Sequence, residues 1–265
     1  MTATTAPPAA TAGSRPRHTA IRIGLAVIAA AILAIALSGL GARSGWWHFR
    51  TGFTVLRWGA YAALAGAVWT AAAAARAWVV SRRQGGAGHG LVLAGLVGVL
   101  VAVVVVTVPW QWRRRASEVP PIHDISTDLT DPPAFVAVLP RRASTGATNP
   151  AQYGGPDVAY QQRSAYADIG PLTLPVPPAA AFDRALATAR DMGWEIVAAD
   201  KNAGRIEATD RTFWFGFYDD IVIRVRPSGT GARVDVRSLS RVGGSDVGTN
   251  ARRIRRYLDR LRAAA

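Results

Sequence analysis

Three long apolar runs in the first 112 residues constrain the fold more than any other feature. They cover residues 21–40, 58–75 and 90–110, and Arg22 is the one charged residue within them. At about 1.5 Å of rise per residue, each run would form a helix of roughly 27–31 Å, which matches the hydrocarbon core of a bilayer. Tryptophans lie at the ends of the runs, as they do at membrane interfaces. The sequence therefore predicts three transmembrane α-helices, with the lipid bilayer as a partner.

The distribution of charge argues against a nucleic-acid partner. The net charge is +14, but residues 1–115 hold twelve arginines and no Asp or Glu. The rest of the chain holds the other 19 basic residues and all 17 acidic residues, a net charge of only +2. The excess positive charge thus flanks the apolar runs, where it would meet lipid headgroups, and no basic stripe is expected on the soluble part.

Composition divides the chain into four parts. Residues 1–19 lack apolar periodicity and predict a disordered tail, and residues 20–112 form the membrane anchor. Eleven of the 16 prolines lie between positions 120 and 178, so we expect residues 113–169 to form an extended, proline-stiffened arm that either wraps on the domain or spans from the membrane to the domain. Residues 170–265 alternate between strand and helix patterns and form the soluble domain.

The soluble domain is expected to be α+β, in the order β-α-β-β-β-β-α. Phe182, Ala185, Leu186, Ala189 and Met192 form one helical stripe that ends at Gly193. A short strand is predicted at the start of residues 170–178, and further strands at 194–199, 205–215, 219–226 and 233–241. A last helix begins near Asn250, with Ile254, Tyr257 or Leu258, and Leu261 on one side. Such an order predicts an antiparallel sheet with helices on one face.

The register of the last hairpin follows from side-chain alternation. If Ile221, Ile223 and Val225 point to the core, then Ser238, Val236 and Val234 must lie opposite them. That register places Arg224 opposite Asp235 and Asp220 opposite Leu239. Asp219 and Asp220 then lie on opposite faces and do not form a catalytic carboxylate pair. We expect the outer face to carry a solvated lattice of ion pairs.

The segment "FYDDIVIRVRP…VDVRSLSRVGGSDVGTNARRI" resembles the core motif of the domain of unknown function 1499 family (DUF1499). The resemblance covers residues 171–261, and "PPIHDISTD" (Pro120–Asp128) resembles the opening segment of membrane-anchored members of this family. A cysteine-containing opening known in the family is not matched, because the chain has no cysteine. The resemblance implies a bacterial or plant family and no established chemistry.

The motif offers a candidate ligand site, for which an anion is the favoured occupant. A glycine-rich turn before a helix directs backbone N–H groups and positive dipole charge at an anion. The sequence favours the simpler interpretation that the same residues serve only as a turn, caps and cross-strand ion pairs. The candidate residues are Asp219, Asp220, Arg237, Ser240, Arg241, Gly243, Gly244, Ser245, Asp246, Asn250 and Arg253.

Catalytic and metal chemistry have weaker support in the sequence. His123 and Asp124 are the candidate metal ligands, but two ligands without an established geometry are a weak signal. No cofactor is expected, because P-loop, GxSxG, HExxH and CxxC motifs are absent from the sequence. We therefore expect a non-enzymatic binding or scaffolding module of the bacterial cell envelope, with an envelope protein or an anionic ligand as partner. The alternative is an envelope hydrolase acting on glycan or lipid.

The expected location is the bacterial inner membrane, as a multi-pass protein. Six arginines flank the spans on each side, so the positive-inside rule gives a tie. We expect the N-terminus to be cytoplasmic because the first helix usually dominates orientation. Three crossings would then place the C-terminal domain outside the cytoplasm.

Overall fold

The computed structural model describes residues 15–84 and 89–263, which fall into two compact units divided after Gln111. Most of the predicted tail, residues 1–14, lies outside the described residues, and residues 15–19 belong to the first helix.

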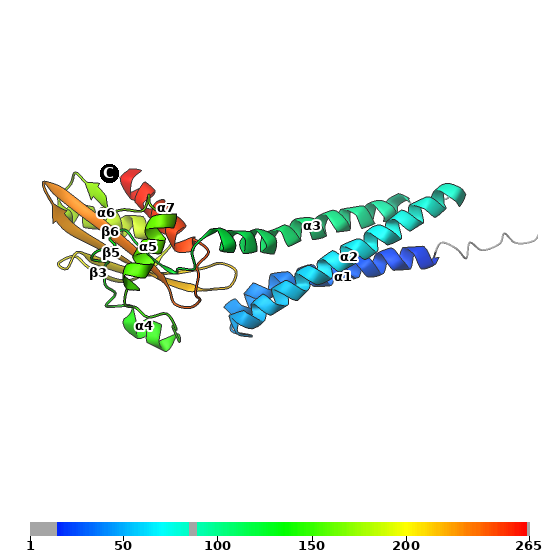
Figure 1. The fold of residues 1–265 in the computed structure, drawn as a ribbon, viewed down its shortest axis with the longest axis horizontal. Helices are drawn as coiled ribbons and strands as arrows, with labels where there is room; N and C mark the ends of the chain where they lie inside the picture. The colour runs from blue at the N-terminus through cyan, green and yellow to red at the C-terminus, as the bar shows by residue number, and fades with distance from the viewer. Residues whose placement is uncertain (1–14, 85–88, 264–265) are drawn as a thin grey trace, which may run out of the picture. The chain divides into compact units, whose positions relative to one another are not determined.

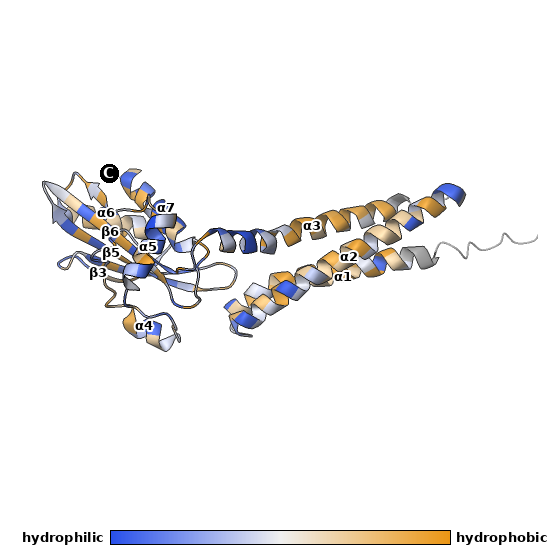
Figure 2. Cartoon of the chain, viewed as in Figure 1, coloured by the Kyte–Doolittle hydropathy of each residue, from blue (hydrophilic) through white to orange (hydrophobic). Residues whose placement is uncertain are grey.

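The first unit consists of long apolar helices (Figures 1 and 2). They are α1 (Arg15–Arg43), α2 (Phe49–Gln84) and α3 (His89–Glu118), the last of which continues into the second unit. Each is long and apolar enough to cross a membrane, as the sequence predicts. Small residues let the helices approach closely: a Cβ on Gly24 of α1 would lie 2.1 Å from the Thr70 hydroxyl of α2. Such contacts replace the hydrophobic effect, which does not drive helix association within lipid.

The second unit is a six-stranded antiparallel sheet with four further helices (Figure 1). The strands are β1 (Asp124–Ser126), β2 (Leu172–Leu174), β3 (Glu195–Asp200), β4 (Arg205–Arg211), β5 (Tyr218–Ser228) and β6 (Gly231–Ser240). The helices are α4 (Leu139–Ser144), α5 (Gly155–Ala165), α6 (Pro178–Asp191) and α7 (Thr249–Ala263). The strand order is β1-β6-β5-β4-β3, and β2 pairs with β6 as well. The chain is therefore an α+β domain preceded by three apolar helices, in agreement with the predicted fold class.

One face of the sheet holds the main core, under α6 and α7. Phe182 and Ala185 of the predicted stripe are buried against the sheet. Tyr257 of α7 stacks on Trp194 with ring centroids 5.1 Å apart, and its hydroxyl donates to the Ala185 carbonyl at 2.9 Å. The 3.6-residue period of both helices thus identified their buried sides correctly.

The predicted register of the last hairpin is confirmed at every pair. Ile221 lies opposite Ser238, Arg224 opposite Asp235, and Asp220 opposite Leu239. Alternation then places Asp219 and Asp220 on opposite faces of the sheet, as expected.

The prediction of a solvated outer face is wrong. Asp220, Asp235 and Arg237 are almost fully buried. The segment between β1 and α5 covers this face, where Phe135 and Val138 form a second apolar cluster with side chains of β5 and β6. The region predicted as an extended arm accordingly contains β1, α4 and α5. Pro140 and Pro156 lie in the first turns of α4 and α5, where a missing N–H costs no helical hydrogen bond.

The predicted strand at residues 205–215 is too long. It ends at Arg211, and residues 212–217 form a tight loop in which the Thr212 N–H donates to the Phe217 carbonyl at 2.8 Å. Gly216 has φ +69°, a conformation that side chains disfavour, and this residue allows the chain to reverse.

Candidate functional site

Asp220 is the centre of a buried ion cluster on the outer face of the sheet. Its carboxylate accepts from Arg142 of α4 and from Arg241, each at 2.7 Å, and from the Thr209 hydroxyl at 2.8 Å. All four side chains are buried. Charges excluded from water in this way persist only when they are paired and hydrogen-bonded, as they are here.

Arg237 forms a second buried pair, with Asp124 of β1. Its Nε and Nη2 atoms donate to the two carboxylate oxygens of Asp124 at 2.9 and 2.8 Å, a bidentate geometry. Its remaining N–H groups donate to the carbonyls of Pro133 and Ala151 at 3.2 and 2.9 Å. The guanidinium therefore fastens the covering segment to the sheet, and the Asp124 carboxylate is held by this one arginine.

Aromatic rings enclose the Arg237 guanidinium. Its central carbon lies 4.9 Å from the Phe135 ring centroid and 5.4 Å from that of Tyr153. Burial, assisted by the Asp124 carboxylate, raises the pKa of Tyr153 to about 12. The Tyr153 hydroxyl is buried and has no hydrogen-bond partner within the part of the chain that the structure describes.

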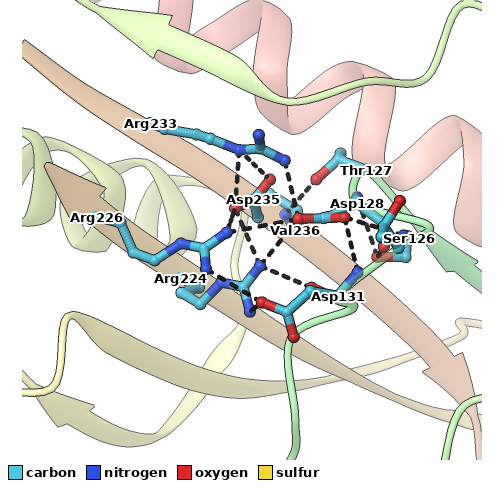
Figure 3. A network of polar contacts seen from close by, with 10 residues as sticks. Ser126, Thr127, Asp128, Asp131, Arg224, Arg226, Arg233, Asp235 and Val236 are labelled. Atoms are coloured by element: carbon cyan, nitrogen blue, oxygen red, sulfur yellow. Dashed lines mark hydrogen bonds and ion pairs between the residues drawn. The ribbon is translucent and has the colours of Figure 1, made fainter. Parts of the chain in front are cut away.

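A larger network lies near the hairpin end of β5 and β6 (Figure 3). It joins three arginines to three aspartates: Arg224, Arg226, Arg233, Asp128, Asp131 and Asp235. Burial alone would raise the pKa of Asp128, but two backbone N–H donors and the nearby arginines outweigh it, so its pKa lies below the usual range. Arg226 and Asp131 are partly open to solvent, which distinguishes this network from the buried Asp220 cluster and the buried Arg237–Asp124 pair.

On the opposite face, Arg253 of α7 gathers the core-facing polar residues of the motif. It donates to Asp219 at 2.6 Å and to Asp210 at 2.8 Å. Asn250 accepts from the Ser238 hydroxyl at 2.7 Å and donates to the Ser240 hydroxyl at 3.0 Å. Both serines are therefore engaged in fixing α7 to β6, and no histidine of the described residues hydrogen-bonds either hydroxyl.

The glycine-rich loop before α7 supplies its own anion. Asp246 accepts the N–H groups of Gly248 and Asn250, each at 2.7 Å, and thus caps the helix. Ser245 accepts the N–H of Val247 at 3.2 Å, and Gly243 has φ +92°, in the region that favours glycine. Burial raises the pKa of Asp246, although the two backbone donors oppose this effect. The carboxylate therefore occupies the position in which an exogenous anion would bind.

The structure thus places the predicted residues in separate groups. Asp220 and Arg241 lie together, as do Asp219, Ser240, Asn250 and Arg253, while Arg237 is in the Asp124 pair. Gly243, Ser245 and Asp246 form the α7 cap loop with Gly244, whose carbonyl lies 3.5 Å from the His123 ring. The Asp220 cluster, the Arg237–Asp124 pair, the network at the hairpin end and the Arg253 cluster together pair seven arginines with seven aspartates. They are Arg142, Arg224, Arg226, Arg233, Arg237, Arg241, Arg253, Asp124, Asp128, Asp131, Asp210, Asp219, Asp220 and Asp235.

His123 lines a pocket of about 190 Å³ on the second unit. The pocket walls come from the start of β1, from the chain before α5 and from α5 itself. Pro121, Ile122 and Val158 supply apolar surface, and Gln152 and Gln161 supply amides. Within the described residues, no group of three or more His, Asp or Glu side chains is placed to hold a metal ion.

Several buried residues that hold the covering segment were not predicted from the sequence. Arg142 completes the Asp220 cluster, and the buried Glu207 accepts the N–H groups of residues 136–138 at 3.0–3.1 Å. The strand sequences did contain a sign that the outer face is covered. Val222 and Leu239 are apolar residues on the face predicted to be solvated, and they indicate that another segment covers it.

The second unit matches one protein family of unknown function. No curated protein matches the chain. A solved structure titled "Crystal structure of Ara h 8.0201" is 14% identical over 36% of this chain and 93% of that chain, with a TM-score of 0.21, too low to indicate a shared fold. A family described as "Protein of unknown function (DUF1499)" matches residues 124–261, which is about half of the chain and includes β1, α4 and α5. The chain therefore belongs to the DUF1499 family.

Proposed function

We propose that this chain is a membrane-anchored, non-enzymatic binding or scaffolding module of the bacterial cell envelope. The observation that carries the proposal is the mutual pairing of the motif's charged side chains. Catalysis requires a nucleophile or a proton-transfer group placed where a substrate can reach it. In this motif the carboxylates and guanidiniums are buried against one another, a pattern that supports an architectural role.

The pocket beside His123 is the proposed contact site for a partner. Its apolar walls and its amides favour an uncharged segment of an envelope protein, which would bury against Ile122 and Val158 and bond to Gln152 or Gln161. An anionic ligand is less favoured at the α7 loop, because Asp246 already accepts its N–H groups and would repel a second negative charge.

An envelope hydrolase is the second candidate, and the position of His123 in the pocket is the observation that favours it. Histidine is the side chain that most often acts as a general base. Its sequence neighbour Asp124 also lines the pocket, but both of its oxygens accept hydrogen bonds from Arg237, which argues against a role as partner base or metal ligand.

Complementation of a deletion strain distinguishes the two candidates. Gln161→Trp would fill the pocket, His123→Ala would remove the histidine, and Tyr160→Ala, at an adjacent α5 position that is 71% exposed, serves as the control. A binding module predicts that Gln161→Trp fails to complement while His123→Ala succeeds. If the His123→Ala variant gives the same phenotype as the deletion strain while the protein still resists proteolysis, the hydrolase is the correct candidate. If both variants complement fully, the pocket is not the functional site.

The proposed sidedness has its own test. We propose that the second unit lies outside the cytoplasm, because three crossings separate it from a cytoplasmic N-terminus. Reporter fusions at Ala116 and after the C-terminal residue would be active on the extracytoplasmic side. Activity of a cytoplasmic reporter at both positions would reverse the orientation and restrict partners to the cytoplasm.

A further inference from the structure

The loop between β4 and β5 presents an aromatic tip that the proposed function does not use. Four of its residues, Phe213, Trp214, Phe215 and Phe217, are aromatic, and Phe213 is 83% exposed. The loop is closed by hydrogen bonds from the Phe217 N–H to the Thr212 hydroxyl and from the Gly216 N–H to the Thr212 carbonyl, at 2.8 and 3.1 Å. The exposed ring is therefore carried by an ordered turn.

The same loop packs on the last part of α3. Trp112 of α3 lies edge-on to Trp214 with ring centroids 5.3 Å apart, and its ring centroid is 6.4 Å from that of Phe215. Phe215 in turn stacks on Phe217, at 5.6 Å. These contacts, all within the second unit, place the loop beside the point at which the chain leaves the apolar run of α3.

The depth of that point in a bilayer follows from helix geometry. Trp112 follows Trp110, the end of the apolar run, by two residues, or about 3 Å along a helix. The interfacial layer extends roughly 5–7 Å beyond the hydrocarbon core on each side, so Trp112 falls within it. Residues 113–115 are all arginine, and arginine at this depth contacts lipid phosphates.

We propose that the β4–β5 loop is a second membrane contact, with the Phe213 ring inserted at the boundary between headgroups and acyl chains. Tryptophan and tyrosine are enriched at this depth, phenylalanine inserts there from interfacial segments, and removal of its exposed apolar surface from water is favourable. The occupant of this surface is thus the bilayer that holds α3. The contact would restrain the second unit against the membrane surface, in addition to its covalent link through α3.

Site-directed spin labelling tests the proposal on the full chain. The chain has no cysteine, so Phe213→Cys, Tyr160→Cys and Val103→Cys each accept a single nitroxide label. Tyr160 is 71% exposed on α5 and reports water, whereas Val103 is 48% exposed on α3 and reports the bilayer core. Each labelled chain would be reconstituted in vesicles of phosphatidylcholine and phosphatidylglycerol. Power saturation would then measure collision with oxygen, which enriches in lipid, and with a water-soluble nickel chelate.

The expected result is that the label at position 213 collides several-fold less with the nickel chelate than the label at 160, while it remains accessible to oxygen. Nickel accessibility at 213 equal to that at 160 would overturn the proposal. Low accessibility to both reagents would also overturn it, because the loop would then be covered by protein. The label at 103 separates this failure from failure of the membrane anchor itself, since it reports lipid whenever α3 spans the bilayer.

Discussion

Removal of Arg237 while Asp124 remains is the sharpest test of the architectural role assigned to the motif. In Arg237→Met the Asp124 carboxylate stays buried without its bidentate partner, and two backbone carbonyls lose their donors. Breaking a buried pair from one side costs about 3–5 kcal/mol, a large part of the 5–15 kcal/mol that stabilises a typical domain. The matched control is Arg226→Met, whose side chain is 42% exposed and whose loss should cost about 0–1 kcal/mol.

The free energy of unfolding would be measured on the full chain in detergent micelles, by pulse proteolysis of the second unit at increasing urea. With an m-value of about 2 kcal/mol/M, the loss corresponds to a fall in the urea midpoint of roughly 1.5–2.5 M. The double variant Arg237→Met with Asp124→Leu should recover part of the loss, because it removes the unpaired charge. A midpoint for Arg237→Met no lower than that of Arg226→Met would refute the reasoning that this pair holds the covering segment.

Three further predictions concern other contacts of the second unit. Because folding lowers the pKa of Asp128, its ionisation stabilises the protein above the unfolded-state pKa of about 3.9. The difference in unfolding free energy between the native chain and Asp128→Asn should therefore shrink as the pH falls through and below that value. Asn250→Ala removes hydrogen bonds that join α7 to β6 and should cost about 1–3 kcal/mol by urea unfolding, and an unchanged midpoint would contradict its anchoring role. Gly231→Ala would place a Cβ 2.2 Å from the Leu174 carbonyl oxygen and should increase amide exchange in β2, whereas Gly170→Ala, which meets open space, should not.

Much of this architecture follows from local patterns. The apolar runs predict α1, α2 and α3, because in lipid a helix must satisfy its own backbone hydrogen bonds. The period of α6 and α7 predicts their buried sides. The two-residue period of β5 and β6 is sufficient to give the register of the hairpin and the separation of Asp219 from Asp220, since a slip of one residue would turn every core side chain to the other face.

The burial of the charged face depends on tertiary structure. An alternation of charged and apolar residues looks the same whether water or another segment covers the charged side. Arg237 and Asp124 are 113 positions apart, and the proline-rich segment that carries Asp124 has no periodic pattern from which its position on the sheet could be predicted. Short-range patterns in the chain therefore specify the helices, the strands and their register. The partner of each buried charge is decided only when β1 has paired with β6 and α4 covers the sheet, because desolvation and ion pairing depend on which distant groups surround a side chain.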